Sequence, residues 1–240
     1  MRLADPAGGL DLPPGYGTCV RVVAMVCIAA CSVVADDDLT RWVDTRIGSQ
    51  TSYELSRGNT YPAVALPSGM TFWSPETGGY ESAQFYRYGD SSLSGLRATH
   101  QASVWLGDYG QFSLMPTTGD PGFLPEQRGS AFRHETETAH PHLYSVELDN
   151  FGLRVEMAPT ARAAVMRVTS SGADTVTFII DPHPPRTTVE DDATAGIVRG
   201  VSLTRMGGAP LAYGCHFALV FDRPSHRLRY IHRLHSYTRV

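Results

Sequence analysis

The residues in this chain best suited to chemistry are four side chains within nine positions, His100, Gln101, Trp105 and Asp108. A sugar is recognised by an apolar platform for the C–H faces of its ring and by a few fixed donors and acceptors for its hydroxyls. The indole of Trp105 suits the platform, and half covering it contributes roughly 2 kcal/mol from area alone. The pattern fits a carbohydrate-binding segment, and it fits a core or interdomain packing role for the tryptophan equally well.

Carboxylates occur along the chain, but their spacing does not select a catalytic pair. Inverting hydrolysis of a glycosidic bond needs two carboxyl groups about 6.5–9.5 Å apart across the ring. Nothing distinguishes Glu76, Asp108, Glu135 and Glu156 in this way. We therefore assign no catalytic residue.

A group of histidines raises the possibility of zinc. His134, His140 and His142 lie close in sequence to Glu135 and Glu137. Their spacing matches no zinc site of defined geometry, so we assign no metal site and expect alternating exposure on strands instead. The sequence also lacks a nucleophile elbow, a phosphate-binding loop and a dinucleotide fingerprint.

Two segments combine glycine, proline and aromatic residues in a distinctive order. They read Gly58-Asn-Thr-Tyr-Pro-Ala-Val-Ala-Leu-Pro-Ser-Gly-Met70 and Thr99-His-Gln-Ala-Ser-Val-Trp-Leu-Gly-Asp-Tyr-Gly110, and the second runs into Leu114-Met-Pro-Thr-Thr-Gly119. With Pro75-Glu76-Thr77 between them, they resemble the N-terminal domain of family 92 glycoside hydrolases. That family carries G-(H/N)-T-Y-P-G-A, P-F-G-M, S-P-(D/E)-T, a T-H segment, D-Y-G-(D/Q) and L-M-P in this order. The resemblance extends from about Leu39 to Asp222.

The resemblance implies an incomplete enzyme. Members of the family are calcium-dependent exo-α-mannosidases that invert the anomeric centre. A β-sandwich comes first, and a longer (α/α)6 barrel follows with the acid and base carboxylates and most calcium ligands. We therefore expect this chain to be the sandwich without the barrel and to be inactive alone. Together with the barrel it is expected to form part of the pocket that binds α-mannoside glycans, and calcium is expected only with the barrel.

The resemblance also adds three binding candidates. Gly58 and Asn59 belong to the first segment, where glycine lets the backbone approach a ligand closely. Tyr80 follows the Pro-Glu-Thr turn where the family places an aromatic residue near the sugar, although it also fits simple strand packing. Asn59 stands where the family more commonly has histidine, and Ala63 and Ser68 depart from its glycine and phenylalanine. The preferred glycan linkage therefore stays open.

The body of the chain alternates with period two, which is typical of β-strands. Tyr144, Val146 and Leu148 are expected to face one way, and Leu153, Val155 and Met157 repeat the pattern after a turn. Similar runs cover residues 163–169, 175–180, 198–204 and 217–221, while residues 183–194 are predicted to be a polar loop. Many short strands without a long helix predict an all-β fold, a large antiparallel β-sandwich. The family comparison refines this to a carbohydrate-binding, mutarotase-like supersandwich.

Length and composition fit one exported domain. The chain has 240 residues, and its net charge of −4 offers no electrostatic surface for nucleic acid. Residues 1–35 are predicted to be an export segment with an apolar run too short to span a bilayer as a helix. The run ends in Ile28-Ala-Ala-Cys31, which resembles a bacterial lipobox and would make Cys31 a lipidated residue of a periplasmic or cell-surface lipoprotein.

The N-terminal segment leaves alternatives open. Cleavage after Ala35 instead of before Cys31 would give a soluble product. The apolar run also fits a buried strand or helix. If the first residues are a mis-start, translation begins nearer the apolar run. A membrane partner is expected only through the lipid anchor.

The last residues differ from the predicted sandwich, which covers residues 39–222. Residues 223–240 contain five arginines and three histidines. They fit a basic or metal-binding tail, but we expect an aberrant tail from a frameshift or truncated gene, because the strand pattern stops abruptly at Asp222. Besides a mannosidase sandwich, the sequence thus permits a non-catalytic carbohydrate-binding lipoprotein or an inactive gene fragment.

Overall fold

The chain divides into two units, Met1–Leu39 and Thr40–Val240. The computed structural model describes residues 38–50, 60–77, 85–100, 112–122, 124–181, 187–192, 196–203 and 213–222. The architecture below is that of the second unit, whose described elements are almost all strands. This confirms the predicted all-β class. The predicted export segment, with Cys31, lies outside the described residues.

One four-stranded antiparallel sheet carries the segments that flank the predicted sugar-binding residues. Its order is β1-β3-β4-β10, and its last pair joins Thr117 to Thr177 across a long stretch of sequence. An isolated bridge between Val64 and Trp73 attaches the Gly-Asn-Thr-Tyr-Pro segment to the outer edge of this sheet. The strands are β1 (Phe72–Glu76), β3 (Gly95–Thr99), β4 (Phe112–Thr117) and β10 (Thr177–Asp181).

A second four-stranded sheet is a simple meander in the order β6-β7-β8-β9. Its central turn follows from the sequence, because Gly152 adopts a φ of 59° that residues with a side chain rarely take. The predicted alternation is confirmed in β8, where Leu153, Val155 and Met157 are buried and Arg154 is exposed. The strands are β6 (Thr138–His140), β7 (Leu143–Leu148), β8 (Leu153–Pro159) and β9 (Ala164–Ser170).

A third sheet, in the order β11-β12-β13, corrects the prediction for residues 183–194. Residues 187–192 of the expected polar loop form β11, which pairs along its whole length with β12. The prediction failed because β11 is an edge strand whose sequence has a single apolar residue, Val189, and so shows no apolar alternation. The strands are β11 (Thr187–Asp192), β12 (Ile197–Ser202) and β13 (Cys215–Val220); the smaller elements are β2 (Ser92–Leu93), β5 (Ser130–Ala131), the helix α2 (Pro125–Arg128) and the 3-10 helix η1 (Leu39–Trp42).

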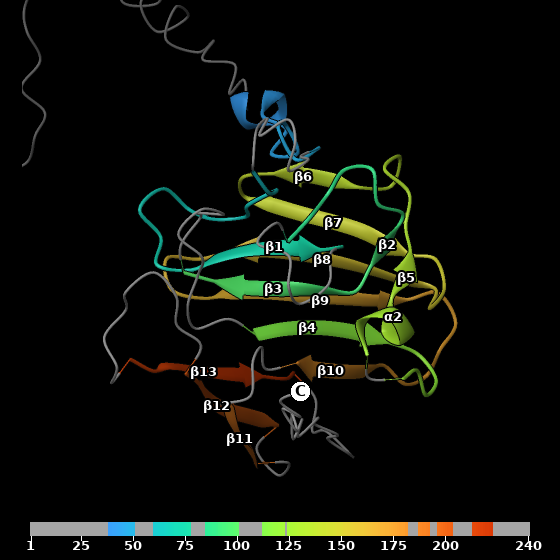
Figure 1. Ribbon diagram of the computed structural model, residues 1–240, viewed down its shortest axis with the longest axis vertical. Helices are drawn as coiled ribbons and strands as arrows, with labels where there is room; N and C mark the ends of the chain where they lie inside the picture. The colour runs from blue at the N-terminus through green and yellow to red at the C-terminus, as the bar shows by residue number, and fades with distance from the viewer. Residues whose placement is uncertain are drawn as a thin grey trace, which may run out of the picture. The chain divides into compact units, whose positions relative to one another are not determined.

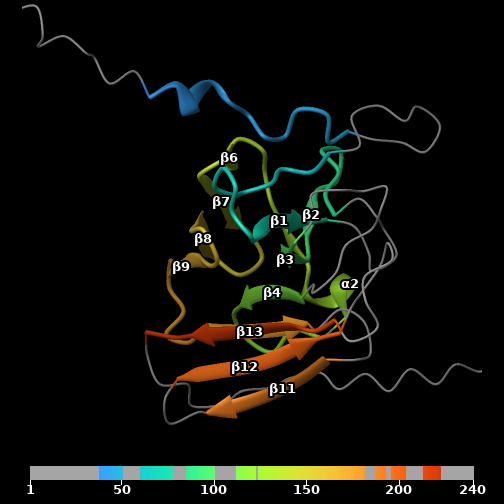
Figure 2. The same ribbon diagram turned by 90° about the vertical axis from the view of Figure 1, so that its left-hand side faces the viewer.

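The two four-stranded sheets form the layers of a sandwich, as predicted (Figure 1). Seen along the strands, β6 to β9 form one column and β1, β3 and β4 the other, with the third sheet across one end (Figure 2). A continuous buried cluster joins the layers, with Leu96 and Ala98 from β3 and Tyr144, Val146 and Val155 from the meander. The sheets are thus packed together on the β6 to β8 side.

Candidate functional site

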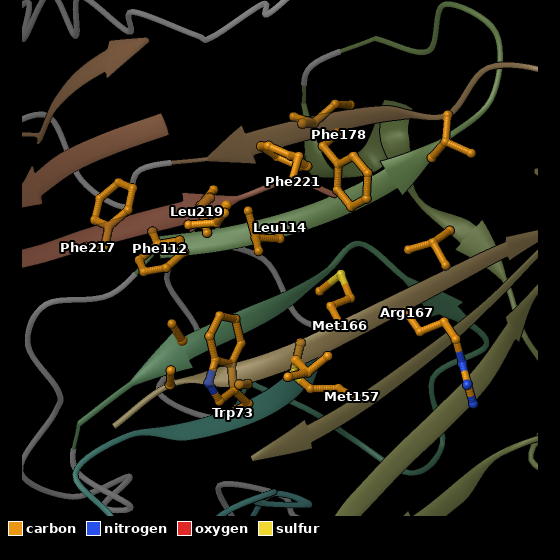
Figure 3. A pocket seen from close by; sticks show the side chains of 18 of the residues that line it. Trp73, Phe112, Leu114, Met157, Met166, Arg167, Phe178, Phe217, Leu219 and Phe221 are labelled. Atoms are coloured by element: carbon orange, nitrogen blue, oxygen red, sulfur yellow. The ribbon is translucent and has the colours of Figure 1, made fainter. Parts of the chain in front are cut away.

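On the β9 side the layers separate and leave an open cleft of about 1740 Å³. Residues of the β1-β3-β4-β10 sheet and of strand β13 form one wall, and β9 lines the other. Leu114 and Leu219 face Met166 across the opening, while Arg167 turns away from it (Figure 3). We call this space the β9–β13 cleft.

The walls of the cleft are mainly apolar. Phe112 stacks on Phe217 with ring centroids 4.2 Å apart, and Phe178 lies 5.3 Å from Phe221. Small-molecule sites usually measure about 300–1,000 Å³ and contain a few convergent polar groups. The cleft is larger than this range and its described lining is mainly apolar, so it chiefly offers hydrophobic contact.

Of the predicted sugar-binding residues, His100 is the one within the described ranges. It directly follows β3 and lines the cleft together with Trp73 and Phe112. Its Nε2 atom lies 3.5 Å from Sγ of Cys215 at the start of β13. His100 is therefore held at the end of the cleft where β3 ends and where β4 and β13 begin.

The partners predicted for His100 lie outside the described residues: Gln101, Trp105 and Asp108. The segment that contains them is joined to the fold at His100 and, after residue 111, at Phe112. Both junctions line the β9–β13 cleft. The fold therefore anchors both ends of this segment at the same end of the cleft.

The second predicted group, Gly58, Asn59 and Tyr80, also lies outside the described residues. The described residues that flank this group, which we call its anchors, are nevertheless in place. The ring centroids of Tyr61 and Phe85 lie 4.9 Å apart, and the Thr77 amide donates to the Phe85 carbonyl at 2.8 Å. These contacts are at the Glu76 end of β1, opposite the end that pairs with Thr99. Five strand residues span about 16 Å, so the anchors do not bring the two predicted groups together.

The structure also adds a residue that the sequence analysis did not select. Trp73 of β1 lines the cleft, is 7% exposed, and its indole Nε1 has no hydrogen-bond partner among the described residues. A buried indole N–H usually finds an acceptor. The available signal was an aromatic residue two positions before the Pro-Glu-Thr motif. The predicted turn at this motif was wrong, because Pro75 and Glu76 are the last residues of β1.

Comparison with protein families assigns the fold. The model of the glycosyl hydrolase family 92 N-terminal domain matches residues 42–238. The chain belongs to this family. The match begins at the end of η1 and continues past the last described strand, so it includes every strand of the sandwich.

Solved structures agree with this assignment. The family 92 inverting mannosidase BT2199 from Bacteroides thetaiotaomicron is 35% identical with a TM-score of 0.73, over 78% of this chain and 25% of that protein. The α-mannosidase BT3965 from the same organism, solved in complex with mannoimidazole, is 27% identical with a TM-score of 0.57, over 68% of this chain and 23% of that protein. The family 92 domain described here thus spans about a quarter of the length of these relatives.

Two further comparisons bear on the family 92 domain. The search of curated proteins found no match. Within the part of the chain that the structure describes, no helix is long and apolar enough to cross a membrane.

In this family 92 domain the Pro-Glu-Thr motif stabilises the sheet. Glu76 is fully buried, pairs with Arg97 and accepts a 2.7 Å hydrogen bond from Ser113. Arg97 in turn lies over the ring of Phe85, 4.4 Å from its centroid. Thr77 donates to Asp90 at 2.7 Å. The motif therefore joins β1, β3, β4 and the following segment, and Glu76 is occupied by structural contacts.

The histidine-rich segment of the domain also has a structural role. The buried carboxylate of Glu137 accepts hydrogen bonds from Tyr144 at 2.8 Å, Tyr86 at 3.0 Å and Arg46 at 3.3 Å, and lies 2.7 Å from Nδ1 of His134. Burial, and then the charge of Glu137, raise the pKa of Tyr86 and Tyr144 well above the ordinary range. Both phenols therefore stay protonated and act as donors.

The other two histidines of that segment lie apart from Glu137. His140 donates through Nδ1–H to the Val43 carbonyl oxygen at 2.9 Å and stacks on His142 with ring centroids 5.8 Å apart. Among the described residues, no group of three or more histidine, cysteine or acidic side chains is arranged to hold a metal ion. The contacts that the structure does show for these histidines are those of a packed surface.

Proposed function

We propose that this chain is the sugar-contacting N-terminal part of an exported, calcium-dependent, inverting α-mannosidase. Its family membership and its similarity to BT2199 and BT3965 support a mannoside substrate. Because the chain spans about a quarter of those relatives, the remaining polypeptide is where the acid and base carboxylates and the calcium ligands are expected. In this division of labour the domain binds the sugar, and an (α/α)6 barrel performs the hydrolysis.

The anchoring of the 101–111 segment is the observation that carries this proposal. The segment contains a tryptophan, an amide and a carboxylate, and both of its junctions lie at one end of the sheet, beside His100. A segment whose two junctions are fixed by a rigid sheet loses less conformational entropy when it binds a ligand. Trp105 is therefore the proposed platform, with His100, Gln101 and Asp108 as partners for the sugar hydroxyls.

The alternative is a stand-alone, non-catalytic lipoprotein that binds carbohydrate. Such a module is expected to have a closed core and a polar surface, because large exposed apolar patches mark interaction sites. The β9–β13 cleft exposes an apolar interior instead. This observation favours a part of a larger assembly over a self-sufficient module.

A hybrid enzyme tests the proposal. Residues up to Asp222 are joined to the portion of BT2199 that follows its matched region, and release of mannose from an aryl α-mannoside is measured with calcium. We expect the hybrid to be active and the 240-residue chain alone to release none. Trp105→Ala in the hybrid should lower kcat/KM by about 100-fold, equal to roughly 2.7 kcal/mol of transition-state binding.

The control for this substitution is Trp42→Ala, which removes an indole that is 74% exposed. It should leave kcat/KM unchanged. Hydrolysis by the chain alone would contradict the division of labour. A Trp105→Ala hybrid as active as its parent would contradict the role of the 101–111 segment.

Export and lipidation form a separate part of the proposal. The sequence around Cys31 supports attachment of a lipid and a periplasmic or cell-surface location. Metabolic labelling with a radioactive fatty acid in a bacterial host should label the wild-type chain and leave Cys31→Ser unlabelled. Labelling of neither protein, with a mature N-terminus at Asp36, would identify cleavage after Ala35 instead.

A further inference from the structure

The side chain of His134 lies between two hydrogen-bond acceptors. Its Nδ1 atom is 2.7 Å from Oε2 of Glu137, and its Nε2 atom is 2.7 Å from the carbonyl oxygen of Tyr88. A carbonyl oxygen can only accept a hydrogen bond, so Nε2 must carry a proton. A neutral imidazole has a single N–H, and a second proton at Nδ1 makes the ring a cation. Whether Nδ1 carries that proton depends on the charge of Glu137.

The surroundings of Glu137 favour a second positive charge beside it. Its buried carboxylate accepts hydrogen bonds from two phenols and from Nη1 of Arg46 at 3.3 Å. Arg46 is shared, because Asp44 accepts from its Nε at 2.9 Å and from its Nη2 at 2.8 Å, and these hydrogen bonds lower the pKa of Asp44. A buried carboxylate is stable only when its charge is paired. A His134 cation supplies the second charge at 2.7 Å.

The rings around His134 also suit a cation. Tyr88 stacks on the imidazole with centroids 4.0 Å apart and planes 5° apart, and Phe132 lies 5.3 Å away with its ring nearly perpendicular. A positive charge over the face of an aromatic ring is attracted to that ring. The side chain of His134 is 26% exposed. Water therefore reaches the imidazole, and its protons can be lost to solvent.

The contact with His134 holds an exposed turn, residues 87–90. This turn belongs to no strand, and two of its amides donate to side chains of other segments instead of to a strand partner. The Tyr88 carbonyl faces His134. A segment held by single contacts at the surface opens more readily than a strand. Loss of the hydrogen bond from His134 is therefore expected to loosen the turn.

From these contacts we infer that His134 is a proton-dependent clamp on residues 87–90. With both ring nitrogens protonated, it donates to the Glu137 carboxylate and to the Tyr88 carbonyl. When one proton leaves for solvent, the other stays at Nδ1 beside the buried charge, and Nε2 presents a lone pair to the Tyr88 oxygen. That contact is repulsive, so the turn is released to water. This role does not depend on the proposed function.

The charges that face His134 set the direction of the pH dependence. They come from its own turn, from the segment before β1, from residues 85–90 and from β7, and they belong to Glu137, Arg46, Tyr86, Tyr88 and Tyr144. Histidine ordinarily changes its charge between about pH 5 and 8. The clamp is closed while His134 is doubly protonated, so its stabilisation of the turn is lost as the pH rises. All residues of the clamp are described, whereas the predicted aberrant tail, residues 223–240, lies outside the described residues.

Two measurements on the 240-residue chain test the clamp. Nitrogen NMR of the imidazole locates the protons of His134, and we expect both nitrogens to be protonated at about pH 6 and Nδ1 alone after the proton is lost. Hydrogen exchange with mass spectrometry, corrected for the intrinsic effect of pH, reports the turn. Protection of residues 87–90 should fall by about tenfold between about pH 5.5 and 8.5, while protection of β8 stays the same.

A conservative substitution separates the clamp from a general effect of pH. His134→Gln keeps an amide that can donate to the Tyr88 carbonyl but does not titrate, so protection of the turn should no longer depend on pH. His142→Gln, at an exposed histidine stacked on His140, is the control and should behave like the wild type.

Three results would overturn the inference. The first is a neutral His134 over the whole pH range, which would place the shared proton on Glu137. The second is a turn equally protected at both pH values in the wild-type chain. The third is a His134→Gln chain with the same pH dependence as the wild type, which would assign the effect to another group.

Discussion

At the scale of single residues, the domain depends on a few fully buried carboxylates that are satisfied by several donors. Glu137 is the most connected of them, with Arg46, Tyr86, Tyr144 and His134 around it. Glu137→Ala leaves the two phenols without their acceptor and leaves the Arg46 guanidinium with Asp44 as its remaining carboxylate partner. We expect the free energy of unfolding to fall by about 3 kcal/mol or more, measured by urea denaturation. Glu135→Ala, at an exposed neighbouring carboxylate, is the control and should change it little.

The tyrosines that contact Glu137 predict how stability depends on pH. Their pKa is raised in the folded state, so the unfolded chain ionises first, at its ordinary pKa of about 10. Their contribution to stability is complete below pH 10 and is lost as the pH rises above it, by up to roughly 1.4 kcal/mol per unit for each tyrosine. Urea midpoints between pH 9 and 11 should fall less steeply for Tyr86→Phe with Tyr144→Phe than for the exposed control Tyr88→Phe.

At the scale of elements, the third sheet depends on one close approach. A Cβ atom on Gly200 of β12 would meet the ring of Phe217 and lie 2.7 Å from the Thr188 carbonyl oxygen. Gly200→Ala should therefore separate β11 from β12 or displace Phe217 from its stack on Phe112, at a cost of about 1–3 kcal/mol. The matched control is Gly172→Ala, since a Cβ there meets nothing within 4 Å. Thermal unfolding and near-ultraviolet circular dichroism report the two effects, and a Gly200→Ala protein as stable as the control would show that the sheet adjusts freely.

The elements also explain how far the sequence could be interpreted. The alternation of β8 revealed the strand because one face is buried and the other is solvated. The same criterion missed β11, because Val189 is the one apolar residue in its sequence and therefore gives no alternation to detect. The pairing of β4 with β10 could not be read either, because it joins residues about 60 apart and depends on the topology between them. For the candidate site, the sequence identified the residue types of the 99–110 segment. It could not show that the anchors of this segment lie at the opposite end of β1 from the anchors of Gly58, Asn59 and Tyr80, because that depends on how β1 pairs with β3.

At the scale of the whole molecule, the proposed division between binding and chemistry predicts the response to calcium. If the calcium ligands lie in the barrel, calcium binds neither the folded nor the unfolded state of this chain and leaves its stability unchanged. The Tm of the chain should therefore be the same in millimolar calcium and in excess chelator, measured by differential scanning fluorimetry, whereas the hybrid with BT2199 should melt higher with calcium. A calcium-dependent rise in the Tm of the chain alone would show that this domain carries a complete metal site.

The contact between Cys215 and His100 has a practical consequence for all of these experiments. Cys215 is the only cysteine in the sequence after residue 31, it is half-buried, and it lines the cleft within 3.5 Å of a proposed sugar-binding residue. Its thiol is therefore a built-in chemical reporter. In the chain without residues 1–35, the rate at which a small maleimide modifies this thiol measures how accessible the cleft is, without an engineered cysteine. It therefore distinguishes a cleft open to solvent from one that is covered.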